Sequence, residues 1–516
     1  MLKYEITSIL YIDISCLKGL NSMIGRKKEL KQLNEICDLD KSSLVAIYGR
    51  RRIGKTYLIN QMFKKHRQDC LFFEFTGAYD ANKQTQLENF VDEVYEWFGA
   101  EPSFEIKGWS DAFRFLKRTI DSEVKKREHQ EKVIIFLDEV PWIDRSNKGG
   151  FLSALGYFWN TWCERQENVV LILCGSNASW IRDKILQNAK GSLYQRVTHQ
   201  IAMMPFDLKE TQAYLLKEKG FDLDNKSVAD LYMIFGGVAK YLSFLEPKES
   251  VTQNIDRIFF SIHSSMYREY DELFSSLFAD KSNYYQGIIE LLCSRRSGFS
   301  LSSIAKALGV LIGAKLKLAI AELEECGFIK GLAKYGNSVR SVNYMIVDSY
   351  ILFHHKWVKG LSRNDIANLP KDYWFANSQS QPYAIWGGYA FEIVCISNIH
   401  LYLRARGSLG FFSGVYHWQY IAKKEDEQGA EIDMVVNYGN SVFDIVECKY
   451  YNDEFLISKS YSKSLKNKLK MFRTYGLKSK QKAELRLVFL TSYGVKMNAE
   501  AHGLNISNVV LDELFE

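Results

Sequence analysis

The chain has 516 residues, 47% of them hydrophobic and 25% charged, and its formal net charge is +6 at pH 7. At ~150 residues per domain this length predicts about three domains, and the mild net charge permits a nucleic-acid partner without arguing for one. No stretch approaches the ~18 apolar residues that a membrane span needs, so we expect no membrane partner. Nine cysteines without a Cys-x-x-Cys pair favour a reduced, cytoplasmic protein over a disulfide framework or a zinc site.

Residues 1–22 lack a basic segment followed by a long apolar one, so a secretory signal is not expected. We interpret them as an N-terminal extension, with Met23 as an alternative initiator, a choice that mass spectrometry of the natural N-terminus decides. Residues 26–39 predict an amphipathic helix with Leu30, Leu33 and Ile36 on one face.

Residues 49–56 read GRRRIGKT and match the phosphate-binding pattern G-x-x-x-x-G-K-[ST] at every fixed position. An apolar run at 44–48 predicts a buried strand before the loop, and residues 56–63 predict a helix after it. In this setting glycines let backbone N–H groups face phosphate oxygens, and the helix N-terminus adds positive charge. Lys55 would reach the outer phosphates and Thr56 would hold Mg²⁺. The predicted nucleotide-binding residues of the loop are Gly49, Arg50, Arg51, Arg52, Ile53, Gly54, Lys55 and Thr56.

A second fixed point follows a predicted strand at 70–75 and predicted helices at 82–100 and 109–124. Residues 133–137 are an apolar run that ends in Asp138 and Glu139. This pattern predicts a buried parallel strand that delivers acid at the carboxyl edge of a sheet, where ligands bind. Asp138 would bind Mg²⁺ through water, and Glu139 would polarise the attacking water.

A third buried strand is predicted at 168–174, followed by small polar residues. Ser176 or Asn177 would sense the γ-phosphate, with an ordinary strand-to-loop turn as the alternative. Arg196 precedes a further strand at 199–203. It would stabilise the transferring phosphate or form a structural salt bridge, and both readings remain open.

These motifs together resemble the archaeal-type ATPases of the STAND branch of AAA-like P-loop NTPases, over about residues 23–245. The resemblance is carried by Gly25-Arg26, residues 49–56, Leu137-Asp138-Glu139, Cys174-Gly175-Ser176 and Gly236-Gly237. It implies ATP hydrolysis with ATP and Mg²⁺ as cofactors. It also implies a helical lid after the sheet and an extra strand between the P-loop and Walker B strands, which residues 70–75 are expected to supply. Ala239 stands where family members usually carry proline.

Residues 283–347 predict three helices, at 285–293, 300–308 and 314–326, then two short strands at 328–332 and 342–347 joined by a turn at Gly336-Asn337. This order resembles a winged helix-turn-helix. The third helix carries Lys315 and Lys317 beside three glutamates, a mixed charge that favours interdomain packing over DNA reading, although both remain open. The polar segment 362–381 is predicted to be a linker.

The last domain contains three separated acidic positions. Glu392 lies on an apolar helix, Asp433 lies near the start of a strand at 430–436, and a hairpin turn at 437–440 leads to a strand with Glu447 and Lys449. Side chains alternate along a strand, so Glu447 and Lys449 share a face and Cys448 points away. Asp433 and Glu447 can share a divalent cation, with Glu392 completing the metal shell. Lys449 would orient or activate water.

This constellation resembles the PD-(D/E)xK nuclease superfamily over about residues 386–515, although Ile432 occupies the usual proline position. The resemblance implies a Mg²⁺-dependent deoxyribonuclease with Asp433, Glu447 and Lys449 as catalytic residues, and such a domain is known in combination with archaeal-type ATPases. The interval 459–482 is basic, contains no acid and interleaves Tyr461, Phe472 and Tyr475. It is predicted to contact DNA phosphates, with a solvated helix face as the alternative. Its basic residues include Lys463, Lys466, Lys468, Lys470, Arg473, Lys478 and Lys480.

The predicted fold class is therefore α/β: a P-loop NTPase parallel sheet with a helical lid, a winged-helix module and a C-terminal α/β restriction-endonuclease-like domain. The predicted segments are an extension (1–22), the ATPase domain (23–206), the lid (207–280), the winged helix-like domain (281–361), the linker (362–381) and the nuclease-like domain (382–516). The predicted function is ATP hydrolysis that controls a metal-dependent DNA endonuclease. The alternative is a regulatory ATPase switch whose last domain is inactive and binds nucleic acid or protein. The expected partners are ATP, DNA and further copies of the chain.

Overall fold

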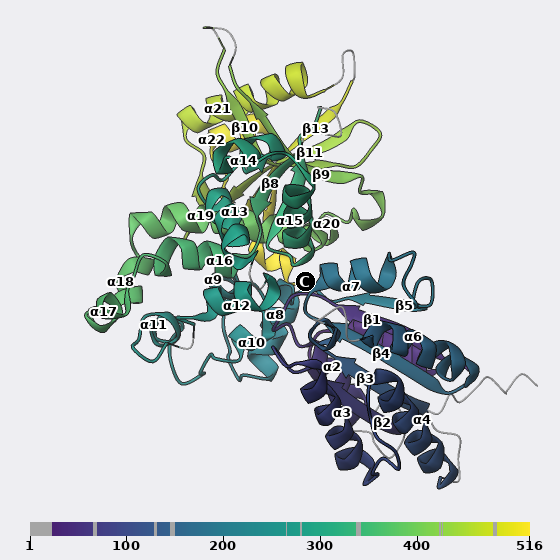
Figure 1. Ribbon diagram of the computed structural model, residues 1–516. Helices are drawn as coiled ribbons and strands as arrows, with labels where there is room; N and C mark the ends of the chain where they lie inside the picture. Colours follow the sequence, from purple (N-terminus) through teal and green to yellow (C-terminus); the bar gives the residue numbers. More distant parts are fainter. Residues whose placement is uncertain are drawn as a thin grey trace, which may run out of the picture. The chain divides into compact units, whose positions relative to one another are not determined.

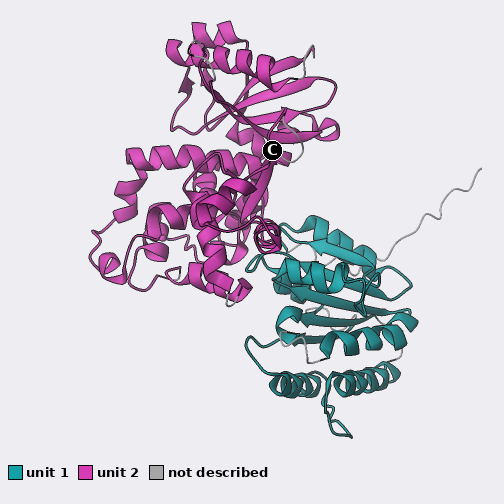
Figure 2. Cartoon of the chain, turned by 45° about the horizontal axis from the view of Figure 1, so that its top comes forward, with its two compact units in different colours: residues 1–204 teal, residues 205–516 magenta. Residues whose placement is uncertain are grey.

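The computed structural model describes residues 23–64, 70–127, 132–144, 150–264, 266–278, 281–336, 342–422, 425, 427–477 and 482–516. The chain divides into two compact units, residues 1–204 and 205–516 (Figure 2). The expected extension 1–22, and with it the choice of initiator, lies outside the described residues, as do Asn337, Lys478 and Lys480. The break after Met204 lies close to the predicted end of the ATPase sheet, but the predicted lid belongs to the second unit.

The first unit is built on a five-stranded sheet, with strand order β2-β3-β4-β1-β5 and every pair parallel (Figure 1). This confirms the predicted parallel α/β sheet. The expected position of one strand is wrong, because β4 lies between the P-loop strand β1 and the acidic strand β3, whereas β2 forms the edge. The strands are β1 (Ser43–Tyr48), β2 (Cys70–Thr76), β3 (Lys132–Asp138), β4 (Val169–Gly175) and β5 (His199–Ala202).

Helices cover both faces of this sheet, because successive side chains of a strand point to opposite faces and both sets are apolar here. One core joins α1 and α2 to the sheet, and the other joins α3, α4 and α6 to its opposite face. The helices are α1 (Lys27–Cys37), α2 (Lys55–Met62), α3 (Lys83–Phe98), α4 (Trp109–Lys125), α5 (Val140–Ile143), α6 (Phe151–Thr161), η3 (Cys163–Arg165), α7 (Ala178–Ile181) and η4 (Arg182–Leu186).

The second unit begins with five helices in the predicted lid region. Gly236 ends α9 in the left-handed region at φ 63°, and a Cβ on Gly237 would collide with the Phe206 carbonyl oxygen. Ala239 is the first residue of α10, a position that suits proline but does not require it. The five helices are α8 (Leu208–Lys217), α9 (Asn225–Phe235), α10 (Ala239–Leu242), α11 (Val251–Phe259) and α12 (Glu269–Phe278).

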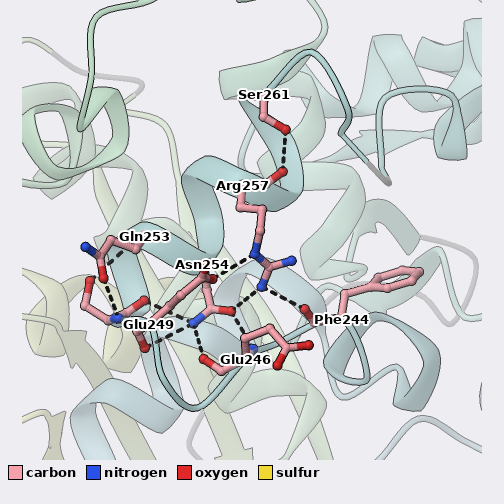
Figure 3. Close-up of polar contacts among 8 residues, drawn as sticks. Phe244, Glu246, Glu249, Gln253, Asn254, Arg257 and Ser261 are labelled. Carbon is pink, nitrogen blue, oxygen red and sulfur yellow. Dashed lines mark hydrogen bonds and ion pairs between the residues drawn. The ribbon is translucent and has the colours of Figure 1, made fainter.

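A polar clamp fixes the turn between α10 and α11 (Figure 3). The fully buried Asn254 side chain donates to the carbonyls of Glu246, Glu249 and Ser250 and accepts from the Glu246 N–H. Arg257 Nε lies 2.8 Å from Glu249 Oε2, and Nη2 donates to Phe244 O at 3.0 Å. The clamp satisfies backbone groups that the turn would otherwise bury unpaired.

The middle of the second unit contains a three-stranded sheet, β6-β8-β7, with three helices packed beside it. The two predicted strands pair antiparallel, and the Ser300 side chain caps α14 by accepting from Ser303 N. The elements are α13 (Ser282–Cys293), β6 (Phe299–Ser300), α14 (Leu301–Leu308), α15 (Ala314–Glu325), β7 (Ile329–Ala333), β8 (Val342–Ile346), α16 (Ser349–Phe353) and η6 (His354–Val358).

The segment predicted to be a linker is instead part of the core. It forms α17 (Arg363–Ala367) and α18 (Tyr373–Ser378). Trp374 is 2% exposed, and its ring lies against the rings of Phe260, Phe353 and Trp357. The backbone N–H of Trp374 donates to Asp256 Oδ1 at 2.8 Å. One large aromatic side chain therefore anchors a segment whose average composition is polar.

The last sheet has the order β15-β13-β11-β10-β9. Strands β9, β10 and β11 run antiparallel in sequence, whereas β13 and β15 run parallel to β11. Strand β15 forms the edge of the sheet beside β13. The strands are β9 (Gly414–Tyr420), β10 (Ala430–Asn437), β11 (Val442–Lys449), β13 (Glu484–Thr491) and β15 (Ser507–Val510), with a separate pair β12 (Phe455–Leu456) and β14 (Val495–Lys496).

One face of this sheet packs on α19 and α20 together with the lid helices, and the other packs on α21 and α22. The lid is also tied to this region by polar contacts, such as His400 Nε2 to Asp207 Oδ2 at 3.0 Å. None of the helices among the described residues is long and apolar enough to cross a bilayer. The remaining elements are α19 (Gln381–Ser397), α20 (Ile399–Ala405), η7 (Leu409–Phe411), α21 (Lys459–Met471), η8 (Phe472–Gly476), α22 (Ala499–Leu504) and η9 (Leu511–Leu514).

Candidate functional site

The glycine loop joins the carboxyl end of β1 to the first turn of α2. Gly49 and Gly54 have φ values of +151° and +93°, and a Cβ on Gly49 would collide with the Met203 carbonyl oxygen. Lys55 is 6% exposed, and its ammonium donates to the carbonyls of Gly49 and Arg50 at 3.0 Å each. The loop therefore curls around its own lysine, and an incoming phosphate would take over that ammonium group.

The other loop residues are held by neighbouring segments. Arg26, 3% exposed, donates from Nη2 to Ile53 O at 2.8 Å and from Nη1 to Met204 O at 2.5 Å. The Arg51 guanidinium lies 5.6 Å from the centre of the Trp142 ring, and Arg52 adopts a positive φ of 71°. Arg26 thus fixes the loop from outside it, a role that the sequence motif alone did not reveal.

Two predicted groups meet at the edge of the sheet beside the loop. The Thr56 hydroxyl donates to Asp138 Oδ2 at 2.5 Å, and Asp138 is 3% exposed. A hydroxyl and a carboxylate in contact are the hard oxygen donors that Mg²⁺ prefers. The residues therefore fit a magnesium ion bound together with nucleotide phosphates.

Glu139 follows Asp138 with a left-handed φ of 47°. Its Oε2 accepts from Ser176 Oγ at 2.9 Å and from Ser176 N at 3.2 Å. Burial raises the pKa of Glu139, and the charge of Lys55 partly opposes that rise. The structure therefore brings Ser176 to the predicted catalytic glutamate, whereas Asn177 caps α7 by accepting from Trp180 N at 2.9 Å.

Arg196 lies away from these groups. Strand β5 runs parallel to β1 with His199 opposite Val45, so the residues just before β5 lie at the amino edge of the sheet. The loop leaves the opposite, carboxyl edge. Arg196 Nη1 pairs with Glu164 Oε1 at 3.0 Å, and both side chains are exposed. The structure does not bring Arg196 to the P-loop of its own chain, and the salt-bridge alternative describes the contact it makes.

A second polar cluster centres on Glu447 in β11, whose side chain is fully buried. Its Oε1 lies 2.6 Å from Lys468 Nζ. Its Oε2 accepts from the Tyr461 hydroxyl at 2.5 Å and lies 3.3 Å from Lys449 Nζ. Lys449 shares the face of Glu447 as predicted, while Cys448 packs in the core on the opposite face. Both oxygens of this carboxylate are therefore engaged by cationic or phenolic donors.

Asp433 reaches the same cluster from β10, where the pairing with β9 shifts register between Ile432 and Val435. Asp433 Oδ2 accepts from Cys448 N at 2.9 Å and lies 3.7 Å from Lys449 Nζ. One ammonium group thus bridges Asp433 and Glu447. The structure brings together Asp433, Glu447 and Lys449.

The carboxyl groups of this cluster ionise differently. Burial, reinforced by Asp433, raises the pKa of Glu392 well above its ordinary value. Burial also raises the pKa of Asp433, with Glu447 adding to the rise. Burial acts the same way on Glu447, but Lys449, Lys468 and the Tyr461 hydroxyl outweigh it and lower its pKa. Glu447 is therefore the firmly ionised acid of the cluster.

The cluster fits a divalent cation in part. Asp433 and Glu447 present hard oxygen donors, and one cation, the Lys449 ammonium, already lies within 4 Å of both. However, within the described ranges no three His, Cys, Asp or Glu side chains converge as metal ligands. Glu392 accordingly does not complete a shell of three carboxylates with Asp433 and Glu447, which is a correction to its predicted role.

The sequence predicted a different role for two residues of this cluster. Tyr461 and Lys468 were placed on an outward face that contacts phosphate, but both turn inward to Glu447. Their spacing contained the signal, because positions 461, 465 and 468 lie on one side of a helix and Leu465 is fully buried. The outward face of α21 instead carries the exposed side chains of Lys459, Lys463, Lys466 and Lys470.

Residues 23–245 match the model of an ATPase domain found predominantly in Archaea. The chain is 25% identical over 339 residues to the uncharacterized protein MJECL04 of Methanocaldococcus jannaschii, covering 65% of this chain and 68% of that protein. It is 21% identical over 230 residues to the uncharacterized ATP-binding protein MJECL26 of the same organism, covering 40% of this chain and 65% of that protein.

Among solved structures, the Walker-type ATPase PABY2304 of Pyrococcus abyssi aligns with a TM-score of 0.48 and 16% identity, over 65% of this chain and 97% of that one. The matched family model covers the loop, Asp138, Glu139 and Ser176. Residues 23–245 are thus an archaeal-type ATPase domain, and its family supports ATP binding and hydrolysis.

Proposed function

We propose that this archaeal-type ATPase uses its nucleotide state to control a metal-dependent deoxyribonuclease site formed by Asp433, Glu447 and Lys449. The observation that carries the proposal is the convergence of these three side chains, with one ammonium bridging two carboxylates on adjacent strands. Such a group can hold a phosphodiester, orient water and neutralise the charge that develops during hydrolysis.

The order of elements around the site supports the nuclease assignment. Helix α19 is followed by the antiparallel strands β9, β10 and β11, then by α21 and the parallel strand β13. This order agrees with the α/β domain that the PD-(D/E)xK resemblance implies, and the acids and the lysine occupy the inner strands β10 and β11. The exposed lysines of α21 supply a positive surface suited to a DNA backbone.

In the proposed ATPase reaction, Lys55 leaves the loop carbonyls and pairs with the outer phosphates of ATP. Thr56 and Asp138 would hold Mg²⁺, which neutralises phosphate charge. Glu139 orients the attacking water, and Ser176 holds the Glu139 carboxylate in position through two hydrogen bonds. The raised pKa of Glu139 brings it closer to neutral pH, which suits a group that accepts a proton from water.

In the proposed nuclease reaction, a water oxygen forms a bond to phosphorus while the bond from phosphorus to the leaving sugar oxygen breaks. Asp433 and Glu447 would hold Mg²⁺, which stabilises charge on the phosphate. Burial alone would lower the pKa of Lys449, but Asp433 and Glu447 raise it, so this lysine stays protonated. It orients the attacking water and stabilises the negative charge that develops on the phosphate. The attacking water releases a proton to solvent, and the leaving oxygen takes a proton from solvent.

The proposed control runs through α9 of the lid. Asp230 in α9 accepts hydrogen bonds from Tyr450 and Tyr383 at 2.7 Å each. Lys226 lies 3.1 Å from Asp230 and 4.5 Å from the centre of the Tyr450 ring. Tyr450 directly follows Lys449 in the chain. A movement of α9 would therefore shift the backbone that carries the catalytic lysine.

The segment 281–361 is proposed to be a winged helix that serves in packing. Its β7–β8 hairpin contacts β9, with the Tyr335 N–H donating to His417 O at 3.3 Å. The Tyr335 ring packs against Tyr416, Phe443 and Phe472. A wing occupied in this way favours the interdomain role over DNA reading.

The function is tested by cleavage of plasmid and single-stranded DNA with Mg²⁺, with and without ATP. Glu447→Gln should abolish cleavage and leave ATP hydrolysis intact, whereas Glu484→Gln, an exposed acid on β13, should behave as wild type. Tyr450→Phe should remove the effect of ATP on cleavage, with the exposed neighbour variant Tyr451→Phe as its control. Cleavage that persists in Glu447→Gln would contradict the assignment.

A second function is favoured by one observation, namely that both oxygens of Glu447 are already occupied by Lys468, Tyr461 and Lys449. In that case the chain is a regulatory ATPase switch whose last domain binds nucleic acid or protein and whose assembly into homo-oligomers follows ATP. Calorimetric titration of the full chain with Mn²⁺ separates the two, because the nuclease requires binding that Glu447→Gln weakens and the switch does not.

A further inference from the structure

A cavity of about 870 Å³ opens in the second unit directly onto Asp433. Its walls come from five segments: the turn between α13 and β6, helix α19, strand β9, strand β10 and helix α21. The lining side chains include Arg295, Arg296, Glu392, His417, Glu431 and Lys468. Both the middle segment and the last domain therefore contribute to the approach to the proposed nuclease site.

Two arginines from the α13–β6 turn line this cavity, and each side chain is fixed by an aromatic ring and one hydrogen bond. The Arg296 guanidinium lies 5.3 Å from the centre of the Tyr389 ring and donates to Ile385 O at 2.9 Å. The Arg295 guanidinium lies 5.6 Å from the centre of the Phe299 ring and donates to Ser297 Oγ at 3.0 Å. A guanidinium has five N–H donors, so both retain donors for a phosphate group.

A buried histidine on the cavity wall is incompletely bonded. His417 is 5% exposed, and its Nε2 lies 3.1 Å from Glu431 Oε1. Its Nδ1 is buried without a hydrogen-bond partner among the described residues. An unsatisfied buried polar atom costs free energy, so a polar ligand in this cavity would relieve a cost already present.

The same histidine lies where the β7–β8 hairpin meets strand β9. The backbone of Lys334, in the β7–β8 hairpin, forms an isolated parallel β-bridge with His417. The backbone N–H of Tyr335 donates to the His417 carbonyl oxygen. The hairpin is thereby fixed to the edge strand β9. The cavity volume falls within the about 300–1,000 Å³ typical of sites for small ligands, which suits a few nucleotides but not a double helix.

We propose that this cavity binds a single strand of DNA, with Arg295 and Arg296 contacting its phosphates and leading it to Asp433. The proposal rests on the proposed nuclease function and specifies its substrate as single-stranded DNA or an unpaired end. The three acids of the wall, Glu392, Glu431 and Asp433, are matched in number by Arg295, Arg296 and Lys468, which line the same cavity.

The test uses the full chain and fluorescence anisotropy of a labelled oligothymidylate, compared with a duplex of the same length, in Ca²⁺ to prevent cleavage. The wild type should bind the single strand at least about tenfold more tightly. The double variant Arg295→Ala/Arg296→Ala should weaken single-strand binding by about 10–100-fold. It should also reduce the slope of log affinity against log salt by about 1.4.

Matched controls keep the result interpretable. Lys217→Ala/Lys248→Ala removes two exposed charges far from α21 in the sequence and should bind the single strand as the wild type does. The variant Arg295→Ala/Arg296→Lys should bind the single strand more tightly than Arg295→Ala/Arg296→Ala, because it keeps one positive charge. Equal or tighter binding of the duplex by the wild type overturns the proposal whatever the variants do, as does unchanged binding by the double arginine variant. Duplex preference with cleavage that depends on Glu447 would refute only this inference, whereas single-strand binding without any cleavage would refute only the nuclease.

Discussion

The two polar sites of this chain both combine lysines with acidic residues, but they pair these charged groups differently. At the P-loop, Lys55 is held by two backbone carbonyls, and the acids Asp138 and Glu139 are bonded to the hydroxyls of Thr56 and Ser176. At the second site, Lys449 and Lys468 pair directly with Glu447. The first site therefore keeps its cation and acids apart until a nucleotide arrives, whereas the second neutralises its own charge.

The difference indicates that the second site needs an activating change. A metal ion at Glu447 would lie beside the ammonium groups of Lys449 and Lys468 and be repelled by their charge, so its binding is favoured when these groups move away. The contact of Asp230 with Tyr450 gives such a change a route from the lid. Under the proposed function, this contact would let the nucleotide state act on the second site.

The largest expected effect concerns the stability of the second unit, which contains the second site. Trp374→Ala should lower the free energy of unfolding of the second unit by about 3–5 kcal/mol, because it removes a buried indole from the core. Calorimetry should show this loss in one transition and no change in that of residues 1–204. The neighbouring exposed variant Phe375→Ala should change stability by less than about 0.5 kcal/mol. A similarly small effect of Trp374→Ala would restore the linker interpretation.

The P-loop side of the comparison predicts a purely catalytic loss. Lys55→Ala should reduce ATP hydrolysis by about 10²–10³-fold, because it removes the cation that contacts the outer phosphates. Phosphate release by the variant measures the effect. Lys31→Ala, an exposed lysine of α1, should hydrolyse ATP as the wild type does. Equal rates for the two variants would place ATP hydrolysis outside this loop.

A smaller effect follows from the raised pKa of Glu392. Between its ordinary value of 4.5 and the raised value in the folded chain, the folded state binds more protons. The free energy of unfolding contributed by this group therefore falls as pH rises through that window. Glu392→Gln should raise the melting temperature at neutral pH by a few degrees, at about 2–4 °C per kcal/mol, and have no such benefit at pH 4.

The control for that experiment is Glu431→Gln, which should change the melting temperature at neutral pH in the opposite direction. The hydrogen bond from His417 lowers the pKa of Glu431 below its ordinary value, although burial opposes the shift. Its stabilising contribution is present above the ordinary pKa and is lost as pH falls. Glu431→Gln should therefore lower the melting temperature at neutral pH. The same sign for both variants would contradict the electrostatic account of the cavity.

The smallest expected effect concerns Arg196, at the opposite edge of the sheet from the P-loop. Arg196→Ala should change stability by no more than about 0.5 kcal/mol, because its pair with Glu164 is exposed. ATP hydrolysis by dilute protein should be unchanged. Arg26→Ala, which removes the contact with Ile53, should reduce it. A strong loss from Arg196→Ala would mean that this arginine acts on the nucleotide of a neighbouring copy.

Contiguous signals made the P-loop site predictable. Residues 49–56 fix the loop, and an apolar run fixes the position of Asp138 and Glu139 because a strand delivers its last residues at one edge of the sheet. The partnership of Glu447 and Lys449 followed equally from alternation along a strand. These inferences depend only on local geometry, which neighbouring residues determine.

The failures all concern contacts between distant segments. The order of strands in a sheet depends on contacts between segments that are far apart in the chain. The sequence of residues 70–75 therefore predicts a strand but does not say which strand it pairs with. Lys468 turns inward because α21 packs across β11, and Trp374 is buried by partners more than a hundred positions away in the case of Phe260. Arg196 was predictable in principle, since a residue that precedes a parallel strand lies at the edge opposite the ligands.

The central claim is that one chain carries two separable activities linked by the lid. It is tested most directly by measuring ATP hydrolysis and single-stranded DNA cleavage in the same reaction for the wild type and Lys449→Ala. The account predicts that Lys449→Ala loses cleavage by at least about 10²-fold and hydrolyses ATP at the rate of the wild type. Cleavage by Lys449→Ala at the wild-type rate would contradict the account.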